Sequence, residues 1–439
     1  MQCYLIWTIG CQMNKAESQR IAGYLDSAGY QAVRSFREAS LIVLNTCVVR
    51  QSAENKVLGT LGLLKGLKKE RHSLSILVTG CFVNSGIEGL TKQFPQVDFF
   101  FRPGAYSELI GWIESQDISG AGQTMNLPVH SSPCALVPIM QGCDNFCSYC
   151  IVPYRRGREV SRPLEEIVHE VEGLVKGGAK QVTLLGQNVD SYGHDLREQP
   201  GLADLLARLN SMNGLARLRF LTNHPKDMNP KLIEAVASLE KVCEHLELPV
   251  QAGDNDILKA MRRGYTVEQY RELICAARRR IPRISLSTDV IVGFPGETEE
   301  QFENTRSLLE EMKFDVVHVA AYCPRPGTIA WREYQDDIAR EVKRERLAKV
   351  ERLQAAIAGG TNSQIRGKTV EVLVEGKKKG KWFGRSRSDK LVFFEDYSDR
   401  LGQLVKVRID KTSPWALQGN IDDDNHPKKE ERKWNSLKA

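Results

Sequence analysis

Three cysteines at the spacing C-x3-C-x2-C are the residues of this 439-residue chain best suited to carry chemistry. Cys143, Cys147 and Cys150 come directly after a short apolar run, 135–141, that the pattern predicts to be a β-strand. Three thiolates can bind three irons of a cubic 4Fe–4S cluster and leave the fourth iron open to a small molecule. A structural zinc ion would need four closed ligands, and no fourth Cys or His lies at a finger-like distance. The spacing therefore favours an iron–sulfur cluster.

A second set of three cysteines is widely spaced but shares a structural position. Cys11, Cys47 and Cys81 each follow the carboxyl end of an expected strand and precede an expected helix. In a parallel sheet such loops meet at one edge, so we predict that the three thiols converge as metal ligands. The other cysteines lack this pattern and are expected to be small apolar residues in cores and loops: Cys3, Cys134, Cys243, Cys275 and Cys323.

The elements that must position these residues alternate between strand and helix. Short apolar runs and helical patterns in residues 1–118 predict a doubly wound α/β domain. Its expected strands are 4–10, 41–46 and 75–80, and its expected helices are 14–28, 51–69 and 105–116. A stretch rich in Gly, Ser and Pro, 116–133, predicts a linker. Six strands are then expected at 135–141, 181–186, 217–221, 245–250, 285–292 and 316–322. Six βα units favour an open, partial barrel that binds ligands at the carboxyl ends of its strands.

The C-terminal part changes in pattern and in charge. A charged helix is expected at 338–357, and strand-like alternation in 366–420 predicts a small antiparallel β-barrel or sandwich. Residues 361–420 hold 13 basic and 7 acidic side chains, which accounts for the net charge of +6 of the whole chain. Basic residues alternate with aromatic ones at Lys377, Lys378, Lys379, Lys381, Trp382, Phe383, Arg385 and Arg387. This pattern suits nucleic-acid phosphates and base stacking, and the alternative is a solvated basic loop.

Several classes of function are not expected. No apolar run approaches the ~18 residues that a membrane-spanning helix needs. No basic residue precedes Lys15, so a signal peptide is not expected, and the chain is expected to be a cytoplasmic protein without a membrane partner. Eleven cysteines in such a chain indicate metal ligation rather than disulfides. No helix carries an exposed apolar seam, so a monomer is the expectation.

Long sequence words around the cysteines resemble the methylthiotransferases of the radical S-adenosylmethionine (SAM) superfamily. The words are GCQMNKAES (10–18), NTCVVRQSAENKV (45–57), GC (80–81), QGCDNFCSYCIVPYRRGREVSRP (141–163), LLGQNVDSYG (184–193), LPVQAGDNDILKAMRRGY (248–265), GFPGETEEQF (293–302) and RPGT (325–328). The resemblance covers nearly the whole chain to about residue 420. The chain departs from it at AES (16–18), where the family usually has Asp before the Ser.

The resemblance implies an architecture and a set of cofactors. It implies an N-terminal methylthiotransferase domain with an auxiliary cluster (1–118), a radical SAM core shaped as a partial (β/α)6 barrel (129–359), a TRAM-like RNA-binding domain (361–424) and a polar tail (425–439). Two 4Fe–4S clusters are implied. The catalytic one is bound by Cys143, Cys147 and Cys150, and the auxiliary one by Cys11, Cys47 and Cys81. The first cluster binds and cleaves SAM to a radical that takes a hydrogen atom from carbon 2 of adenine. The second carries the sulfur, which another SAM methylates.

Four more residues are implied to bind SAM. Tyr149 resembles the superfamily aromatic beside the SAM adenine, and simple packing over the cluster is its alternative. Gly186 and Gln187 match the region that contacts the SAM amino group in relatives, and a strand-end turn is their alternative. Gln251 follows another strand end and is expected to line the same pocket.

The substrate follows from the same resemblance. The words CDNFC and IVPYRRGREVSRP favour the group that modifies N6-isopentenyladenosine next to the anticodon of tRNA. The alternatives are threonylcarbamoyl-adenosine in tRNA, an aspartate of a ribosomal protein, and a non-catalytic iron–sulfur protein that binds RNA. Expected partners are the tRNA anticodon stem-loop, SAM, an electron donor such as flavodoxin or ferredoxin, and a sulfur donor. The basic run Arg155, Arg156 and Arg158 is expected either to contact RNA phosphate or to pair with carboxylates.

Overall fold

The structure is a computed structural model that describes residues 2–83, 86–116 and 132–422. Most of the expected linker 116–133 and the whole expected tail 425–439 lie outside the described residues. The chain folds as two compact units, Met1–Gln354 and Ala355–Ala439. In the described ranges, no helix combines the length and the apolar character needed to cross a membrane.

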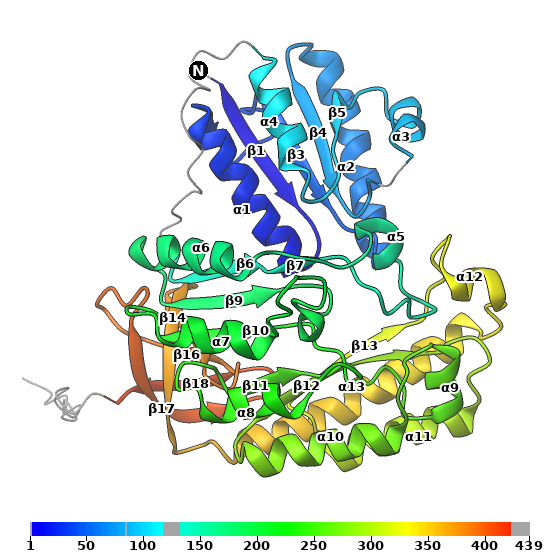
Figure 1. The fold of residues 1–439 in the computed structure, drawn as a ribbon, viewed down its shortest axis with the longest axis vertical. Coiled ribbons are helices and arrows are strands. Elements are labelled where there is room, and N and C mark those ends of the chain that lie inside the picture. Colours follow the sequence, from blue (N-terminus) through cyan, green and yellow to red (C-terminus); the bar gives the residue numbers. More distant parts are fainter. Residues whose placement is uncertain (1, 84–85, 117–131, 423–439) are drawn as a thin grey trace, which may run out of the picture. The chain divides into compact units, whose positions relative to one another are not determined.

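The first unit begins with a parallel five-stranded sheet (Figure 1). Its order is β2 (Gln31–Ala32), β1 (Cys3–Thr8), β3 (Leu41–Thr46), β4 (Ser75–Gly80) and β5 (Phe99–Phe100). Every residue of the middle strand β3 is buried, which explains its continuous apolar run. The two outer strands have two residues each and were not predicted, because so short a segment shows no periodicity.

Helices cover both faces of this sheet, as a doubly wound fold requires. On one face lie α1 (Gln12–Ser27) and α4 (Tyr106–Glu114), and on the other lie α2 (Gln51–Glu70) and α3 (Ile87–Gln93). Alternate residues of β3 divide between the faces: Leu41 and Val43 pack towards α1, and Ile42 and Leu44 pack towards α2. The predicted fold class is confirmed for this part of the chain.

The remainder of the first unit is an open barrel of six parallel strands. One three-stranded sheet holds β6 (Cys134–Pro138), β9 (Gln181–Leu185) and β10 (Arg217–Phe220), and another holds β11 (His245–Glu247), β12 (Ser285–Val292) and β13 (Val316–Ala321). A bridge between Leu218 and Val242 joins the two sheets. Among the described residues β6 and β13 do not pair, so the barrel stays open. All six strands lie where the sequence predicts them.

Helices and short strands complete the barrel. Its helices are α6 (Leu164–Lys176), α7 (Leu202–Asn210), α8 (Pro230–Ser238), α9 (Asn255–Ala260), α10 (Val267–Arg280), α11 (Glu299–Met312) and α12 (Ile329–Glu333). The antiparallel pair β7 (Met140–Gln141) and β8 (Val160–Ser161) closes the base of a long excursion that contains α5 (Val152–Arg156). The C-x3-C-x2-C motif lies in this excursion, so the pairing of β7 with β8 anchors both ends of the cysteine loop.

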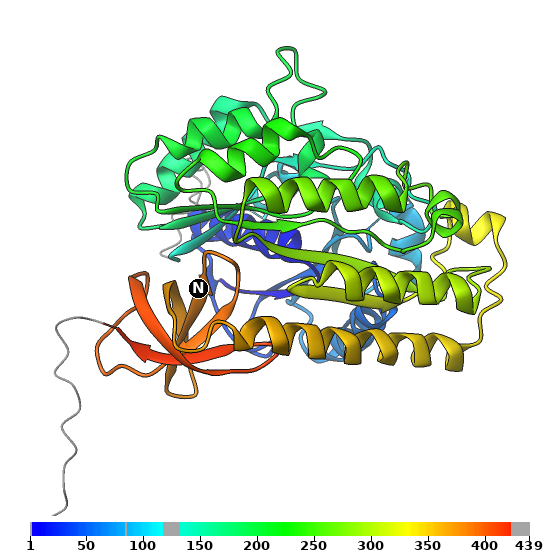
Figure 2. The ribbon, with the colours of Figure 1, turned by 90° about the horizontal axis from the view of Figure 1, so that it is seen from below.

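The second unit contains a closed five-stranded barrel (Figure 2), and the long helix α13 (Arg340–Ser363) leads into it. The barrel order is β14 (Thr369–Lys378), β15 (Lys381–Ser386), β16 (Leu391–Phe394), β18 (Leu417–Ile421) and β17 (Leu404–Thr412). All neighbours are antiparallel except β16 and β18, which run parallel. The predicted small antiparallel β-barrel is confirmed, and its one parallel pair follows from closure, because a closed ring with an odd number of strands must contain at least one parallel pair.

The two neighbouring leucines of α2 test how this helix packs. Leu64 is fully buried in the sheet–helix core, whereas Leu63 is 57% exposed. Leu64→Ala is expected to lower the free energy of unfolding of this domain by about 2–5 kcal/mol, because it leaves a cavity. Leu63→Ala is expected to change it by less than about 0.5 kcal/mol. Urea unfolding followed by circular dichroism measures both, and equal losses would contradict the assigned helix face.

Candidate functional site

Three adjacent strands of the N-terminal sheet bring Cys11, Cys47 and Cys81 to one edge. The strands are β1, β3 and β4, and the pairing of Thr46 with Gly80 sets Cys47 and Cys81 side by side. A Cβ added at Gly10 would lie 2.8 Å from the Cβ of Cys47, so the loop before Cys11 closely approaches Cys47. The predicted convergence of these three loops is therefore present in the structure.

Two buried asparagines, which the sequence reasoning missed, hold these loops. The Asn14 amide donates to Asn45 Oδ1 at 2.8 Å and to the Thr46 carbonyl at 3.0 Å. The Asn45 amide donates back to the Asn14 carbonyl at 2.8 Å, and the Cys11 thiol donates to Asn14 Oδ1 at 3.3 Å. The available signal for Asn45 was a polar residue directly after the apolar run LIVL (41–44).

The loop with Cys143, Cys147 and Cys150 is held mainly through its backbone. The Cys143 N–H donates to the Gly157 carbonyl at 3.2 Å, and the Cys150 N–H donates to the Cys147 carbonyl at 2.9 Å. Ser148, which is fully buried, is fixed to the end of α9: its N–H donates to the Met261 carbonyl and its hydroxyl to the Ala260 carbonyl. These bonds determine the shape of the loop without using the cysteine sulfurs.

The residues predicted to bind SAM lie around this loop at the carboxyl ends of strands. Gln187, after β9, accepts a hydrogen bond from the Gly142 N–H at 2.7 Å and so holds the start of the cysteine loop. Gly186 allows close packing, since a Cβ there would lie 2.7 Å from the Met140 side chain. Gln251 is buried and has a left-handed φ of 72°, and its backbone bonds to Asp289 and Ile291 of β12.

Tyr149 is held by a buried arginine that the sequence reasoning also missed. Arg263 is 4% exposed and donates to Tyr149 Oη at 3.4 Å and to Cys147 Sγ at 3.3 Å. The same guanidinium donates to the Pro249 carbonyl at 2.8 Å and to Tyr265 Oη at 3.0 Å. Among the described residues, its hydrogen bonds go to a cysteine sulfur and to neutral oxygens, and Asp289 interacts with it electrostatically without a hydrogen bond.

Buried polar atoms without partners gather at the ends of β9 and β10. Asn188 Oδ1, Asn223 Oδ1 and His224 Nε2 are buried and have no hydrogen-bond partner among the residues that the structure describes. Burial, helped by Arg263 and Lys226, lowers the pKa of His224 to about 2, so this imidazole is neutral at pH 7. Buried polar atoms of this kind cost free energy unless a ligand or water satisfies them. The ends of β9 and β10 therefore suit a polar ligand. In the sequence, the polar segment NHPKD (223–227) shortly after a strand was the signal for this site.

The two sets of cysteines differ in exposure: Cys47, Cys81 and Cys147 are buried, Cys143 and Cys150 are partly buried, and Cys11 is exposed. Burial, together with the Cys81 thiol, raises the pKa of Cys47 to about 11, and burial raises the pKa of Cys143 to about 11. Burial and the Cys147 thiol raise the pKa of Cys150 to about 12. Binding iron as thiolates must therefore release protons. No three His, Cys, Asp or Glu side chains of the described residues surround a point that could hold one metal ion. A cubic cluster differs from such a site, because each cysteine binds a separate iron.

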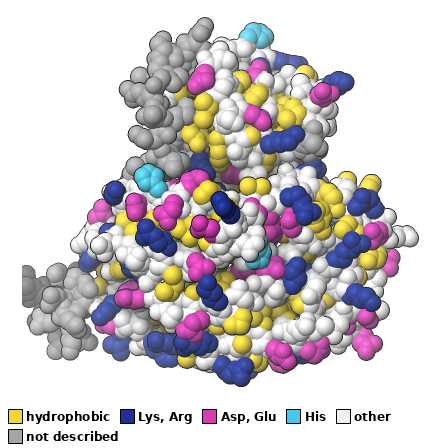
Figure 3. Space-filling view, viewed as in Figure 1, with side chains coloured by type: hydrophobic (Ala, Val, Ile, Leu, Met, Phe, Trp, Pro, Cys, Tyr) yellow, Lys and Arg dark blue, Asp and Glu magenta, His cyan; other side chains and the backbone are white. Residues whose placement is uncertain are grey.

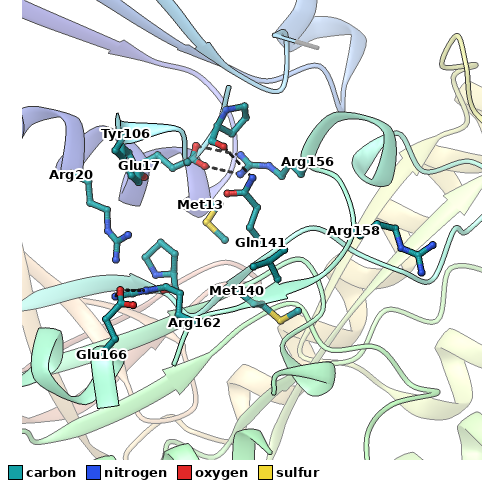
Figure 4. A pocket seen from close by; sticks show the side chains of 14 residues that line it. Met13, Glu17, Arg20, Tyr106, Met140, Gln141, Arg156, Arg158, Arg162 and Glu166 are labelled. Atoms are coloured by element: carbon teal, nitrogen blue, oxygen red, sulfur yellow. Dashed lines mark hydrogen bonds and ion pairs between the residues drawn. The ribbon is translucent and has the colours of Figure 1, made fainter. Parts of the chain in front are cut away.

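The basic run after the third cysteine does not act as one surface. Arg156 is buried and pairs with Glu17 of α1 at 2.6 Å, and its Nε donates to Cys81 Sγ at 3.3 Å. For Arg156, the predicted contact with RNA phosphate is therefore wrong, and the alternative prediction, pairing with a carboxylate, is confirmed. Arg158 remains exposed and pairs with Asp144 at 2.8 Å. Arg156 and Glu17 line a pocket of about 430 Å³ between α1 and β6–β8, with Arg20, Met13 and Arg162 around it (Figure 4).

The C-terminal barrel exposes fewer aromatic rings than the sequence pattern predicted. Trp382 is 7% exposed and belongs to the barrel core, so base stacking on this ring is ruled out. Phe383 is half-buried beside Phe393, and Lys377 lies over the Trp382 ring at 4.9 Å. Tyr397 and Trp415 are exposed instead. On the face seen in Figure 3, acidic and basic side chains are interspersed.

Three protein families match consecutive parts of the chain. The Radical SAM superfamily matches residues 137–309, the family described as "Uncharacterized protein family UPF0004" matches residues 3–102, and the TRAM domain matches residues 364–421. Among solved structures, the radical SAM methyltransferase TsrM from Kitasatospora setae matches with a TM-score of 0.55 and 15% identity over 75% of this chain and 74% of its own. The cobalamin-dependent SAM radical enzyme OxsB matches with a TM-score of 0.51 and 12% identity over 81% of this chain and 56% of its own. These structural likenesses concern the fold alone, and with the family matches they confirm the predicted fold class.

Curated relatives match over nearly the whole length, and each is named tRNA-2-methylthio-N(6)-dimethylallyladenosine synthase. The relative from Dehalococcoides mccartyi (strain CBDB1) is 50% identical over 96% of this chain and 99% of its own. The relative from Chloroflexus aurantiacus is 48% identical over 95% and 91%, and that from Moorella thermoacetica is 44% identical over 96% and 98%. The chain therefore belongs to the family of tRNA-2-methylthio-N(6)-dimethylallyladenosine synthases.

Proposed function

We propose that this chain inserts a methylthio group at carbon 2 of N6-isopentenyladenosine next to the anticodon of tRNA, with one SAM as radical source and another as methyl donor. The single observation that carries this proposal is the position of Arg156. It ends helix α5, directly after the loop of Cys143, Cys147 and Cys150, and its guanidinium contacts Cys81. Arg156 thus links the segment of the core cysteines to the auxiliary set, and we propose that both sets act on one substrate.

The cofactors of this family are SAM and two 4Fe–4S clusters. We assign the core cluster to Cys143, Cys147 and Cys150, which are the catalytic residues of the proposal, and the auxiliary cluster to Cys11, Cys47 and Cys81. Thiolate ligands fit such clusters, and three ligands leave one iron open in each. A core cluster held by these three cysteines would supply the electron for the cleavage of SAM.

The chain's own residues bind and orient the reactants. In our proposal Tyr149 lies against the SAM adenine, with its ring held by Arg263. Gly186, Gln187 and Gln251 line the SAM pocket at the strand ends, and Gln187 also holds the start of the cysteine loop. The unpartnered amide and imidazole atoms near His224 give the pocket free polar atoms for a ligand. The burial of Cys47, Cys81 and Cys147 limits the access of water to the reacting groups.

The tRNA substrate explains the C-terminal barrel. The TRAM domain match and the local basic excess support an RNA-facing role for this unit. Carbon 2 of adenine is reached only when the base leaves its stack, and an unpaired anticodon loop lowers the cost of that step. A ribosomal-protein aspartate or threonylcarbamoyl-adenosine is not favoured, because the curated relatives carry the name of the dimethylallyladenosine enzyme.

Further parts of the proposal concern partners and segments. We propose an electron donor such as flavodoxin or ferredoxin, a separate sulfur donor, a monomeric enzyme and a cytoplasmic location. The functional segments in this proposal are the auxiliary-cluster domain (1–118), the radical SAM core (129–359), the RNA-binding domain (361–424) and the tail (425–439).

Replacing one cysteine from each set should separate the two roles. Cys147→Ala should abolish cleavage of SAM to 5′-deoxyadenosine, because the core cluster loses a ligand. Cys47→Ala should still cleave SAM but add no methylthio group to RNA. Cys275→Ala, on the exposed face of α10, is the matched control and should keep both activities. Mass spectrometry of nucleosides and 5′-deoxyadenosine measures all three, and full methylthiolation by Cys47→Ala would contradict the auxiliary-cluster assignment.

The glycine before the first core cysteine offers a test of the loop itself. Gly142 has φ +85°, and an added Cβ would lie 1.9 Å from the Arg158 carbonyl oxygen. Gly142→Ala should therefore shift the loop and lower the iron bound by the core set several-fold. Gly29→Ala is the control, since Gly29 has φ +84° but open space around it and pays only the backbone strain of about 1 kcal/mol. Equal iron contents in both variants would mean that the loop shape does not govern cluster binding.

A further inference from the structure

We propose that Arg156 is a positioning residue that raises the reduction potential of the auxiliary cluster. This inference rests on the proposed function, because it requires a cluster on Cys11, Cys47 and Cys81. Arg156 belongs to the radical SAM core, whereas the sulfur that it contacts belongs to the N-terminal sheet. The residue would therefore let the core influence the electronic state of the second cluster.

The guanidinium of Arg156 makes two different kinds of contact. Its Nε donates to Cys81 Sγ at 3.3 Å, and its terminal nitrogens donate to the Glu17 carboxylate at 2.6 and 3.3 Å. The fork shape of arginine allows both contacts at once, which a single ammonium group does not. Glu17 thus fixes the guanidinium so that Nε faces the sulfur.

Burial makes this contact strong. The Arg156 side chain is 2% exposed and that of Glu17 is 5% exposed, so solvent screens their charges little. A hydrogen bond to a cluster sulfur, or a positive charge beside it, stabilises the reduced cluster, which carries one more negative charge. The Nε–H of Arg156 therefore favours the reduced state of the cluster. The negative charge of Glu17, which contacts the guanidinium rather than the sulfur, partly opposes this effect.

A second ion pair in the same region provides the matched control. Arg20 of α1 pairs with Glu170 of α6 at 2.7 Å, so it too links the N-terminal sheet domain to the barrel. Arg20 and Arg156 both line the pocket in Figure 4, but no hydrogen bond from Arg20 to a cysteine is recorded in the described residues. Removing the Arg20–Glu170 ion pair therefore shows how the potential responds to a weakened contact between the domains, without the loss of a hydrogen bond to a cysteine.

The experiment isolates the auxiliary cluster in the full chain. Cys143, Cys147 and Cys150 are replaced by Ala, the protein is reconstituted with iron and sulfide, and its midpoint potential is measured by redox titration followed by electron paramagnetic resonance. Iron and sulfide content and the circular dichroism spectrum are measured in each variant. In this background we compare Arg156→Gln, Arg156→Lys, Glu17→Gln and Arg20→Gln.

The variants are expected to move the potential in opposite directions. Arg156→Gln should shift it to a more negative value, and Glu17→Gln should shift it to a more positive one, because the guanidinium charge is then uncompensated. Arg156→Lys keeps the charge and the pairing with Glu17 and should lie between Arg156→Gln and the parent. Arg20→Gln should leave the potential unchanged. Arg156→Lys and Glu17→Gln keep the test informative if Arg156→Gln does not fold, since Arg156→Gln alone strands a buried carboxylate.

Two negative outcomes have different meanings. If the parent with only Cys11, Cys47 and Cys81 binds no iron, the auxiliary-cluster assignment fails, and the role of Arg156 falls with it. If the parent holds a normal cluster and the Arg156 variants have the parent's potential, only the role of Arg156 is overturned. Equal shifts in the Arg156→Gln and Arg20→Gln proteins would also overturn it, because the effect would then come from the contact between domains.

Discussion

The site depends on one constraint: parallel strands deliver the loops after their carboxyl ends to a single edge of the sheet. β1, β3 and β4 are neighbours, so the residues after them meet although they are far apart in the chain. The close approach has a cost, because Gly10 and Gly80 leave no room for a Cβ beside Cys47 and Thr46. The same constraint gathers Gln187, His224 and Gln251 at the strand ends of the barrel.

A buried arginine lies next to a cysteine sulfur in each of the two sets. Each set of cysteines has one sulfur that accepts a hydrogen bond from a guanidinium: Cys81 from Arg156 and Cys147 from Arg263. Burying a charge is costly unless it is paired, and clusters ligated by thiolates carry the negative charge that provides such pairing. The two arginines differ in the described part of the chain, since Arg156 pairs with the Glu17 carboxylate and the other hydrogen bonds of Arg263 go to neutral oxygens. The structure thus gives the two cysteine sets different electrostatic surroundings.

Much of this arrangement could be predicted from the sequence. The N-terminal strands β3 and β4 are nearly continuous apolar runs because they are buried, and the cysteine spacing of the core loop is local, so both can be predicted directly. The role of Arg156 could not be predicted, because a run of arginines does not reveal that one of them turns inward to meet Glu17 of α1. The prediction that Trp382 stacks on bases failed for a related reason. Alternation in a strand shows which residues share a face, but it does not show which face lies inside the barrel. Asn14, Asn45 and Arg263 act through tertiary contacts that have no local pattern.

The central claim is that a single chain performs both sulfur insertion and methylation on one modified adenosine. The most direct test is an anaerobic reaction of the reconstituted protein with SAM, a reductant and two anticodon stem-loops, one isopentenylated and one unmodified. Mass spectrometry of the digested RNA detects an added methylthio group. The account predicts product on the isopentenylated stem-loop only. Cleavage of SAM with no change in either RNA would contradict the assigned substrate, and an absence of SAM cleavage would contradict the radical reaction itself.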